Sequence, residues 1–79
     1  MSPTLFWHKN FRFFFFSREE ARMHVHVSSP EGEAKFWLEP TIALADFCQL
    51  NKRVLNELQK VVEERTDEIK QAWKKHFRS

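Results

Sequence analysis

Two histidines, His24 and His26, are the residues of this sequence best placed to do chemistry, because a single valine separates them. Successive side chains of a β-strand point to opposite faces, so both imidazoles would project from the same face. Two parallel ring nitrogens can bind one divalent metal ion, and an open coordination position would let that ion activate water for hydrolysis. One interpretation is therefore a small metal-dependent nuclease or hydrolase centred on this pair.

Two imidazoles make only half of a metal site, and the further ligands are not specified by spacing. Glu20 or Glu39 could supply a carboxylate and His8 a third imidazole. The competing interpretation is that the histidine pair is structural, partly buried and hydrogen-bonded beside Trp37. The sequence indicates no catalytic residue, and it calls for no cofactor other than a divalent metal at the pair.

Length and composition limit the class of protein. A chain of 79 residues is too short for two hydrophobic cores, so we expect one domain over residues 1–79. A lone cysteine, Cys48, and the lack of a signal-peptide pattern predict a reducing, cytoplasmic location. The apolar run at 13–16 is far shorter than the roughly 20 residues that cross a membrane. A net charge of +2 favours dedicated nucleic-acid binding only weakly.

Turn signals and alternation predict that residues 1–48 form an antiparallel sheet of four or five strands. The expected strand ranges are 5–8, 11–16, 23–28, 34–38 and 41–45. The first hairpin turns at Lys9 and Asn10, where asparagine tolerates the positive φ that a tight turn needs. The second turns at 29–32, which holds a proline and the single glycine.

Residues 51–77 are expected to form one long C-terminal helix, with Asn51 as its N-cap, packed on one face of the sheet. The fold class is then α+β. Apolar residues recur at three–four spacing along the helix, and Arg65 is the one charged residue in that stripe. An unbroken helix would be about 39 Å long, whereas strands of about six residues reach about 20 Å. Either the helix breaks near Thr66 and Asp67, or its end packs on a second subunit; we favour the second explanation.

Strand alternation divides the sheet into two faces, provided that no bulge interrupts residues 13–16. One face is wholly apolar and suits the helix; its members are Phe11, Phe13, Phe15, Met23, Val25, Val27, Ala34, Phe36 and Leu38. The other face ends at Glu39 and mixes aromatic and basic side chains, namely Arg12, Phe14, Phe16, His24, His26, Lys35 and Trp37. A single helix covers only one face, so we expect this mixed set to meet solvent or a partner.

Exposed aromatic residues interleaved with basic ones are typical of a recognition surface. One interpretation is a protein–protein interface, in a homodimer or a hetero-complex. Another is a platform for single-stranded nucleic acid, with the aromatic rings stacking on bases and Arg12 and Lys35 contacting phosphates. The modest net charge favours the protein interface.

Several motifs along the whole chain resemble one family, the small bacterial domain-of-unknown-function family DUF4160. They are Met1–Thr4, Phe11–Ser17, His24–Val27, Glu33–Pro40, Ala72-Trp73 and His76-Phe77. The chain departs from the family at residues 21–23, where members often carry proline. The resemblance implies a bacterial cytoplasmic protein whose gene often lies beside that of another small protein, in arrangements similar to toxin–antitoxin pairs. It implies no catalytic activity, and it points to residues 17–20 and the histidine pair as the places to look for function.

These observations together predict a non-enzymatic interaction or regulatory module. We expect it to act as a homodimer or with a small protein from a neighbouring gene, without membrane contact and with nucleic acid as a secondary partner. The metal-dependent hydrolase at His24 and His26 remains the alternative.

Overall fold

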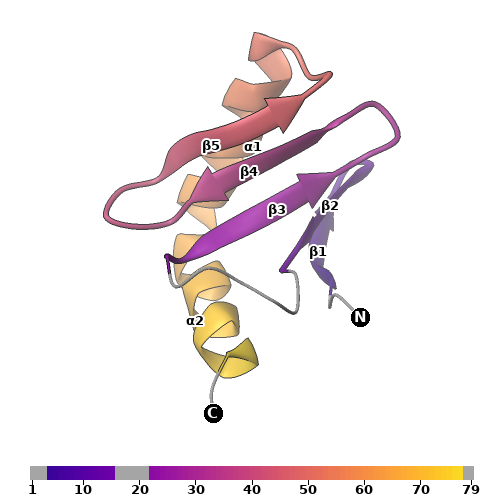
Figure 1. Cartoon of the computed structure of the whole chain (residues 1–79). Helices are drawn as coiled ribbons and strands as arrows, with labels where there is room; N and C mark the ends of the chain where they lie inside the picture. The colour runs from indigo at the N-terminus through magenta and orange to yellow at the C-terminus, as the bar shows by residue number, and fades with distance from the viewer. Residues whose placement is uncertain (1–3, 16–21, 78–79) are drawn as a thin grey trace.

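The computed structural model describes residues 4–15 and 22–77, which form one antiparallel sheet followed by two helices (Figure 1). The strands are β1 (Thr4–His8), β2 (Phe11–Phe14), β3 (His24–Ser28), β4 (Glu33–Trp37) and β5 (Ala43–Cys48). The helices are α1 (Lys52–Glu64) and α2 (Thr66–His76). Strand order in the sheet is β1-β2-β3-β4-β5, so each strand pairs with the next along the chain. The predicted α+β class with an antiparallel sheet is confirmed.

Local chemistry explains where the elements turn and begin. The β1–β2 turn has its positive φ at Lys9 (56°) rather than at the expected Asn10. In the β3–β4 turn the hydroxyl of Ser29 accepts hydrogen bonds from the N–H groups of Glu31 and Gly32. A Cβ atom at Gly32 would overlap the carbonyl oxygen of Cys48, which explains the single glycine here. Asn51 caps α1 as predicted, accepting a 2.9 Å hydrogen bond from the N–H of Val54.

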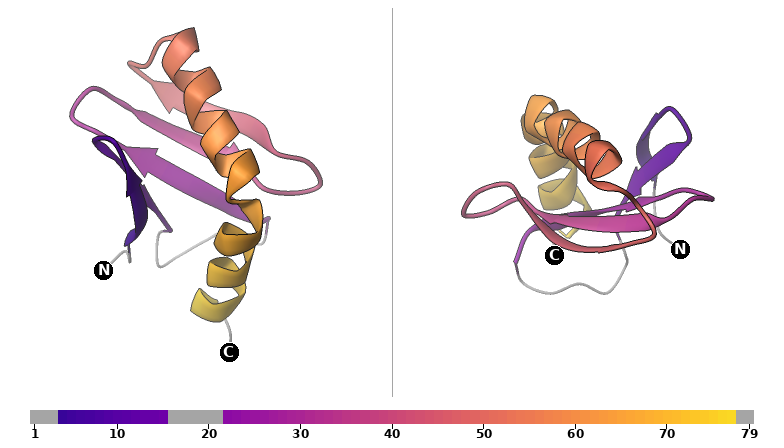
Figure 2. Two further views of the ribbon diagram at one scale, coloured as in Figure 1. Left: turned by 180° about the vertical axis from the view of Figure 1, so that it is seen from behind. Right: turned by 90° about the horizontal axis from the view of Figure 1, so that it is seen from above.

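The core lies between the helices and one face of the sheet, seen from behind in Figure 2. The apolar face predicted from alternation is confirmed, since all its members are buried except Met23, which is half-buried. Leucine, valine and isoleucine side chains of the helices pack against it, chiefly Leu55, Leu58, Val61, Val62 and Ile69. Two register shifts occur, within β1 and between β4 and β5, and both fall outside the β2 run on which the alternation depended.

The prediction of one long helix is wrong. α1 ends at Glu64 and α2 begins at Thr66, with Arg65 between them at φ −113° and ψ 23°. The guanidinium of Arg65 stacks over the ring of Phe6 at 3.6 Å, and it donates hydrogen bonds of 2.9 and 3.0 Å to the carboxylate of Glu68. The charged residue in the apolar stripe therefore marks the break, because its side chain turns to a ring on β1.

The favoured explanation for the long apolar stripe, packing of its end on a second subunit, is also wrong. Ile69 and Trp73 are buried within the chain itself. The Trp73 ring meets Phe15 edge-on, with 5.2 Å between ring centroids, and lies 4.2 Å from Phe77. The C-terminal helix thus completes the core of its own sheet.

Candidate functional site

The sheet face opposite the two helices brings together most of the mixed aromatic and basic set predicted from the sequence. Cross-strand pairing puts Phe14 opposite His26, His26 opposite Lys35, and His24 opposite Trp37. Phe16 lies outside the described residues. We call this surface the open face and define it by Trp7, Arg12, Phe14, His24, His26, Lys35 and Trp37. Figure 2 shows α1 on the other side of the sheet and α2 running past the end of the sheet, where Trp73 contacts His24.

Trp7 belongs to the open face although the sequence reasoning did not place it there. It pairs with Arg12 across the first hairpin and is 60% exposed. Alternation through the two-residue turn would have found it, because Trp7 and Arg12 lie at equal distances from Lys9 and Asn10. Residues directly opposite in an antiparallel pair share a face.

Basic side chains lie over the aromatic rings of the open face. The guanidinium of Arg12 is 4.4 Å from the centre of the Phe14 ring. Trp37 carries two cations, Arg22 at 4.1 Å and Lys35 at 4.5 Å. Arg22, which the sequence reasoning also missed, is held by a 2.9 Å hydrogen bond from its Nε to the carbonyl of Glu39. Such contacts contribute about 0.5–1 kcal/mol each at exposed sites.

Two members of the open face are buried rather than exposed as expected. Phe14 is 7% exposed, since Arg12 lies over its ring and His26 stacks on it at 5.6 Å. His24 is 0% exposed. Its ring lies edge-on to two tryptophans, Trp37 at 5.7 Å and Trp73 at 5.2 Å. Its Nδ1–H donates a 2.7 Å hydrogen bond to the carbonyl of Arg22, an arrangement typical of a structural histidine.

The proposed metal ligands are brought together only in part. The rings of His24 and His26 lie 5.0 Å apart and edge-on. Because Nδ1 of His24 is engaged, a metal would have to bind through its Nε2. His8 lies on the helix side and bonds Glu57, while the Glu39 carboxylate accepts from the N–H of Met23; Glu20 lies outside the described residues. Within 4–15 and 22–77, no three His, Cys, Asp or Glu side chains are grouped as metal ligands.

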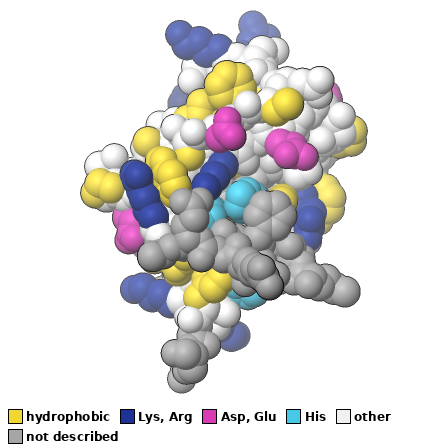
Figure 3. Space-filling model, in the orientation of Figure 1, with side chains coloured by type: hydrophobic (Ala, Val, Ile, Leu, Met, Phe, Trp, Pro, Cys, Tyr) yellow, Lys and Arg dark blue, Asp and Glu magenta, His cyan; other side chains and the backbone are white. Residues whose placement is uncertain are grey.

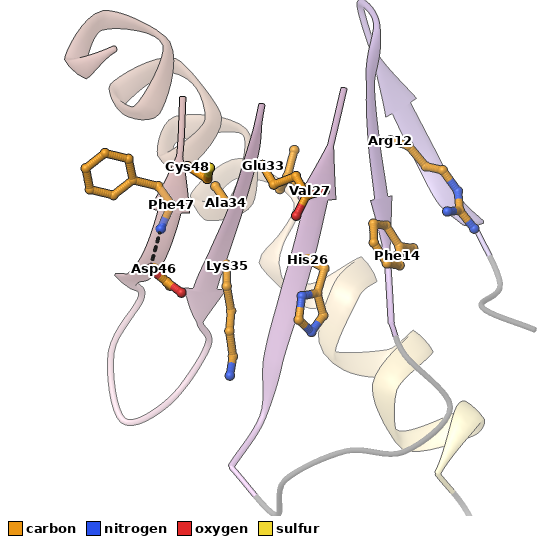
Figure 4. A pocket seen from close by; sticks show the side chains of 10 residues that line it. All are labelled: Arg12, Phe14, His26, Val27, Glu33, Ala34, Lys35, Asp46, Phe47 and Cys48. Atoms are coloured by element: carbon orange, nitrogen blue, oxygen red, sulfur yellow. Dashed lines mark hydrogen bonds between the residues drawn. The ribbon is translucent and has the colours of Figure 1, made fainter. Parts of the chain in front are cut away.

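A shallow cavity of about 420 Å³ crosses the open face from β2 to β5 (Figure 4). Its charged lining is mixed, with Arg12 and Lys35 against Glu33 and Asp46. The aromatic side chains of Phe14 and His26 complete the wall on β2 and β3. Figure 3 shows the same mixture from outside, with histidine near the centre and both signs of charge around it. This surface suits a partner of mixed polarity.

A cluster of charged side chains on the helix side of the sheet links the first hairpin to α1 by hydrogen bonds. One carboxylate oxygen of Glu57 accepts hydrogen bonds from Nζ of Lys9 at 2.8 Å and from Nε2 of His8 at 2.7 Å. The hydrogen bond from Lys9, followed by that from His8, lowers the pKa of Glu57 below its ordinary value. Its contribution to stability therefore depends on pH.

We expect Glu57→Gln to lower the urea midpoint of unfolding at neutral pH, modestly because the site is exposed to solvent. Since the folded-state pKa lies below the unfolded-state pKa, the carboxylate stabilises the fold above the unfolded-state value. That contribution is lost as the pH falls through the folded-state value. The gap between wild type and variant in the urea midpoint should close in this acidic range. A gap of constant size across the range would contradict the assignment.

Comparison with known proteins gives one match. The family model described as a domain of unknown function, DUF4160, matches residues 10–74 of the chain. No curated protein and no solved structure matches the chain. Neither helix in the described part of the chain is long and apolar enough to cross a membrane.

Proposed function

Since the chain belongs to the DUF4160 family, a domain of unknown function, we propose its role from the open face itself. The protein is a non-enzymatic interaction and regulatory module of a small bacterial toxin–antitoxin-like gene pair. It binds a partner protein through the open face in the cytoplasm. The partner we expect first is the small protein encoded by the neighbouring gene.

The observation that carries this proposal is that the helices pack on one face of the sheet, with Trp73 of α2 reaching His24 at its end, while the rest of the other face carries aromatic and basic residues around a cavity. Trp7 is largely exposed beside Arg12, and Trp37 and Lys35 are half-buried. Tryptophan and arginine are the residues most enriched where protein interfaces gain their affinity. A partner that buries Trp7 would therefore gain a large apolar contact area.

The cations that lie over the aromatic rings favour a protein, rather than a single-stranded nucleic acid, as the partner of the open face. Arg12 lies over Phe14, and two cations lie over Trp37, so a base could stack on those faces only by displacing them. Glu33 and Asp46 line the same cavity and would repel a phosphate backbone. Contact with nucleic acid is therefore a secondary expectation.

Charge reversal at the open face tests the proposal with the partner from the neighbouring gene. We expect Lys35→Glu to weaken that complex at least about tenfold, because it places a third acid beside Glu33 and Asp46 and removes a cation. Lys60→Glu makes the same change on α1 and should leave affinity within about twofold. Isothermal titration calorimetry measures both, after matched thermal melts show that the variants are folded. Equal affinity of all three proteins would contradict the proposal.

The alternative function is a metal-dependent nuclease or hydrolase at His24 and His26. Native mass spectrometry of protein purified without chelator tests it. If the wild type carries a stoichiometric divalent metal and His26→Ala does not, the metal-dependent enzyme replaces the interaction module as the proposed function. A metal-free complex with the neighbouring protein would support it.

A further inference from the structure

The β5 edge of the sheet carries exposed apolar side chains that no described element covers. Leu44 is 36% exposed and Phe47 is 52% exposed. Leu44 pairs with Phe36 and Phe47 pairs with Ala34, both of which are core residues, so Leu44 and Phe47 face the helix side. β5 is the outermost strand at the edge opposite β1 (Figure 1). The apolar rows of the core therefore run out to an edge strand and end in solvent.

The register shift in β5 determines which of its residues share a face. Asp46 pairs with Lys35 and Leu44 with Phe36, so Ala45 is the extra residue of a bulge. Because of this bulge, Ala43, Asp46 and Cys48 point to the open face, while Leu44 and Phe47 point to the helix side. Starting from either end of β5, the first side chain therefore points to the open face (Ala43 or Cys48) and the second to the helix side (Leu44 or Phe47).

We propose that a second copy of this chain pairs with β5, antiparallel, about a two-fold axis between Ala45 and Asp46. In this register Ala43 lies opposite the partner's Cys48, and Leu44 lies opposite the partner's Phe47. Each pair then joins residues of the same face, as antiparallel pairing requires. A two-fold interface of this kind is self-complementary by construction.

The neighbouring registers fail on charge or on face. An axis through Asp46 would place two carboxylates directly opposite each other, which is destabilising. An axis through Ala45 would set Leu44, on the helix side, against Asp46, on the open face. In the proposed register the carboxylate instead meets the methyl group of Ala45.

The gain from pairing comes from the exposed apolar side chains and from the backbone groups of the edge. The core row Val27, Ala34 and Phe47 would continue through the partner's Leu44 and the partner's Phe36. The main-chain N–H of Phe47 donates a 2.9 Å hydrogen bond to the carboxylate of Asp46, and pairing would exchange this bond for one to the partner's strand. The cavity reaches Asp46, Phe47 and Cys48 on β5, but Arg12 and Lys35 lie on β2 and β4, so Lys35→Glu tests partner binding on a strand that the proposed dimer does not pair.

Sedimentation velocity under reducing conditions, over a concentration series of the full chain, measures the dimer. We expect a monomer–dimer equilibrium whose Kd rises at least about 100-fold in Phe47→Glu, because each dimer loses the contact twice. Trp7→Glu is the matched control, an exposed aromatic residue on the opposite edge, and should leave Kd unchanged. A chain that stays monomeric throughout, or a dimer equally sensitive to Trp7→Glu, would overturn the proposal.

The register has its own test, which does not depend on the stability of a charged variant. Residues directly opposite in an antiparallel pair have Cα atoms about 4.5–5.5 Å apart, within the range that a disulfide spans. Ala43→Cys should therefore form a covalent dimer with the partner's Cys48 on mild oxidation, and adding Cys48→Ser should abolish it. Failure of Ala43→Cys to cross-link would overturn the register. A monomer that forms a hetero-complex sensitive to Phe47→Glu would instead assign β5 to a strand of another protein.

Discussion

Replacing Trp73 with alanine should cost about 3–5 kcal/mol of unfolding free energy, the range for a large aromatic residue removed from a core. The ring of Trp73 contacts Phe15 on the sheet side of the core, His24 at the start of β3, and Phe77 behind it. These contacts hold α2 against the sheet. In a domain of this size the loss corresponds to a fall in Tm of roughly 12–40 °C, measured by circular dichroism.

Trp7→Ala is the matched control for this prediction. The same residue type is removed, but from a position that is mostly exposed on the edge strand β1, so stability should change by less than about 0.5 kcal/mol. If Trp73→Ala left the melting curve of the monomer unchanged and altered only the oligomeric state, the packing of α2 within its own chain would be refuted.

His24→Ala should be the second most damaging change, at about 2–4 kcal/mol. The substitution opens a cavity between Trp37 and Trp73 and leaves the carbonyl of Arg22 without its 2.7 Å hydrogen bond. His24→Asn keeps an amide donor near the position of Nδ1, so it should recover part of the loss. Urea denaturation of the three proteins at one pH measures the difference.

The same variants separate a structural role from metal binding. If His24 is structural, the alanine and asparagine variants differ in stability, and purification without chelator yields the same metal content in both variants as in the wild type. If His24 and His26 hold a metal, both variants lose the ion, and a chelator should lower the Tm of the wild type alone. A chelator-sensitive melt of the wild type would therefore contradict the structural assignment.

The parts of the fold that the sequence predicts correctly are those that depend on local periodicity. Alternation along β2, β3 and β4 identified the buried face, since neighbouring side chains of a strand must point to opposite sides. The capping by Asn51 was equally local. The fifth strand lies later than expected, at Ala43–Cys48, because its bulge and its exposed side chains obscure the period.

What the sequence could not supply depends on contacts between distant segments. A break near Thr66 was the less favoured alternative from the sequence, and the contact of Arg65 with the ring of Phe6 on β1, which accompanies the break, appears in no helical pattern. The burial of His24 depends on where α2 places Trp73. Arg22 lies before the start of β3, so the alternation of side chains along that strand could not place it over the ring of Trp37.

The order of elements along the chain has a consequence for synthesis on the ribosome. Every strand of the sheet precedes both helices, so the sheet can pair strand by strand before the layer that covers it has been made. At about 5–20 residues per second, the segment from β5 to the end of α2 takes on the order of a few seconds to emerge. During that interval Phe13, Val25 and Phe36 face water. The nascent chain is then most exposed to aggregation and most in need of a chaperone, and arrival of the last helix ends that need.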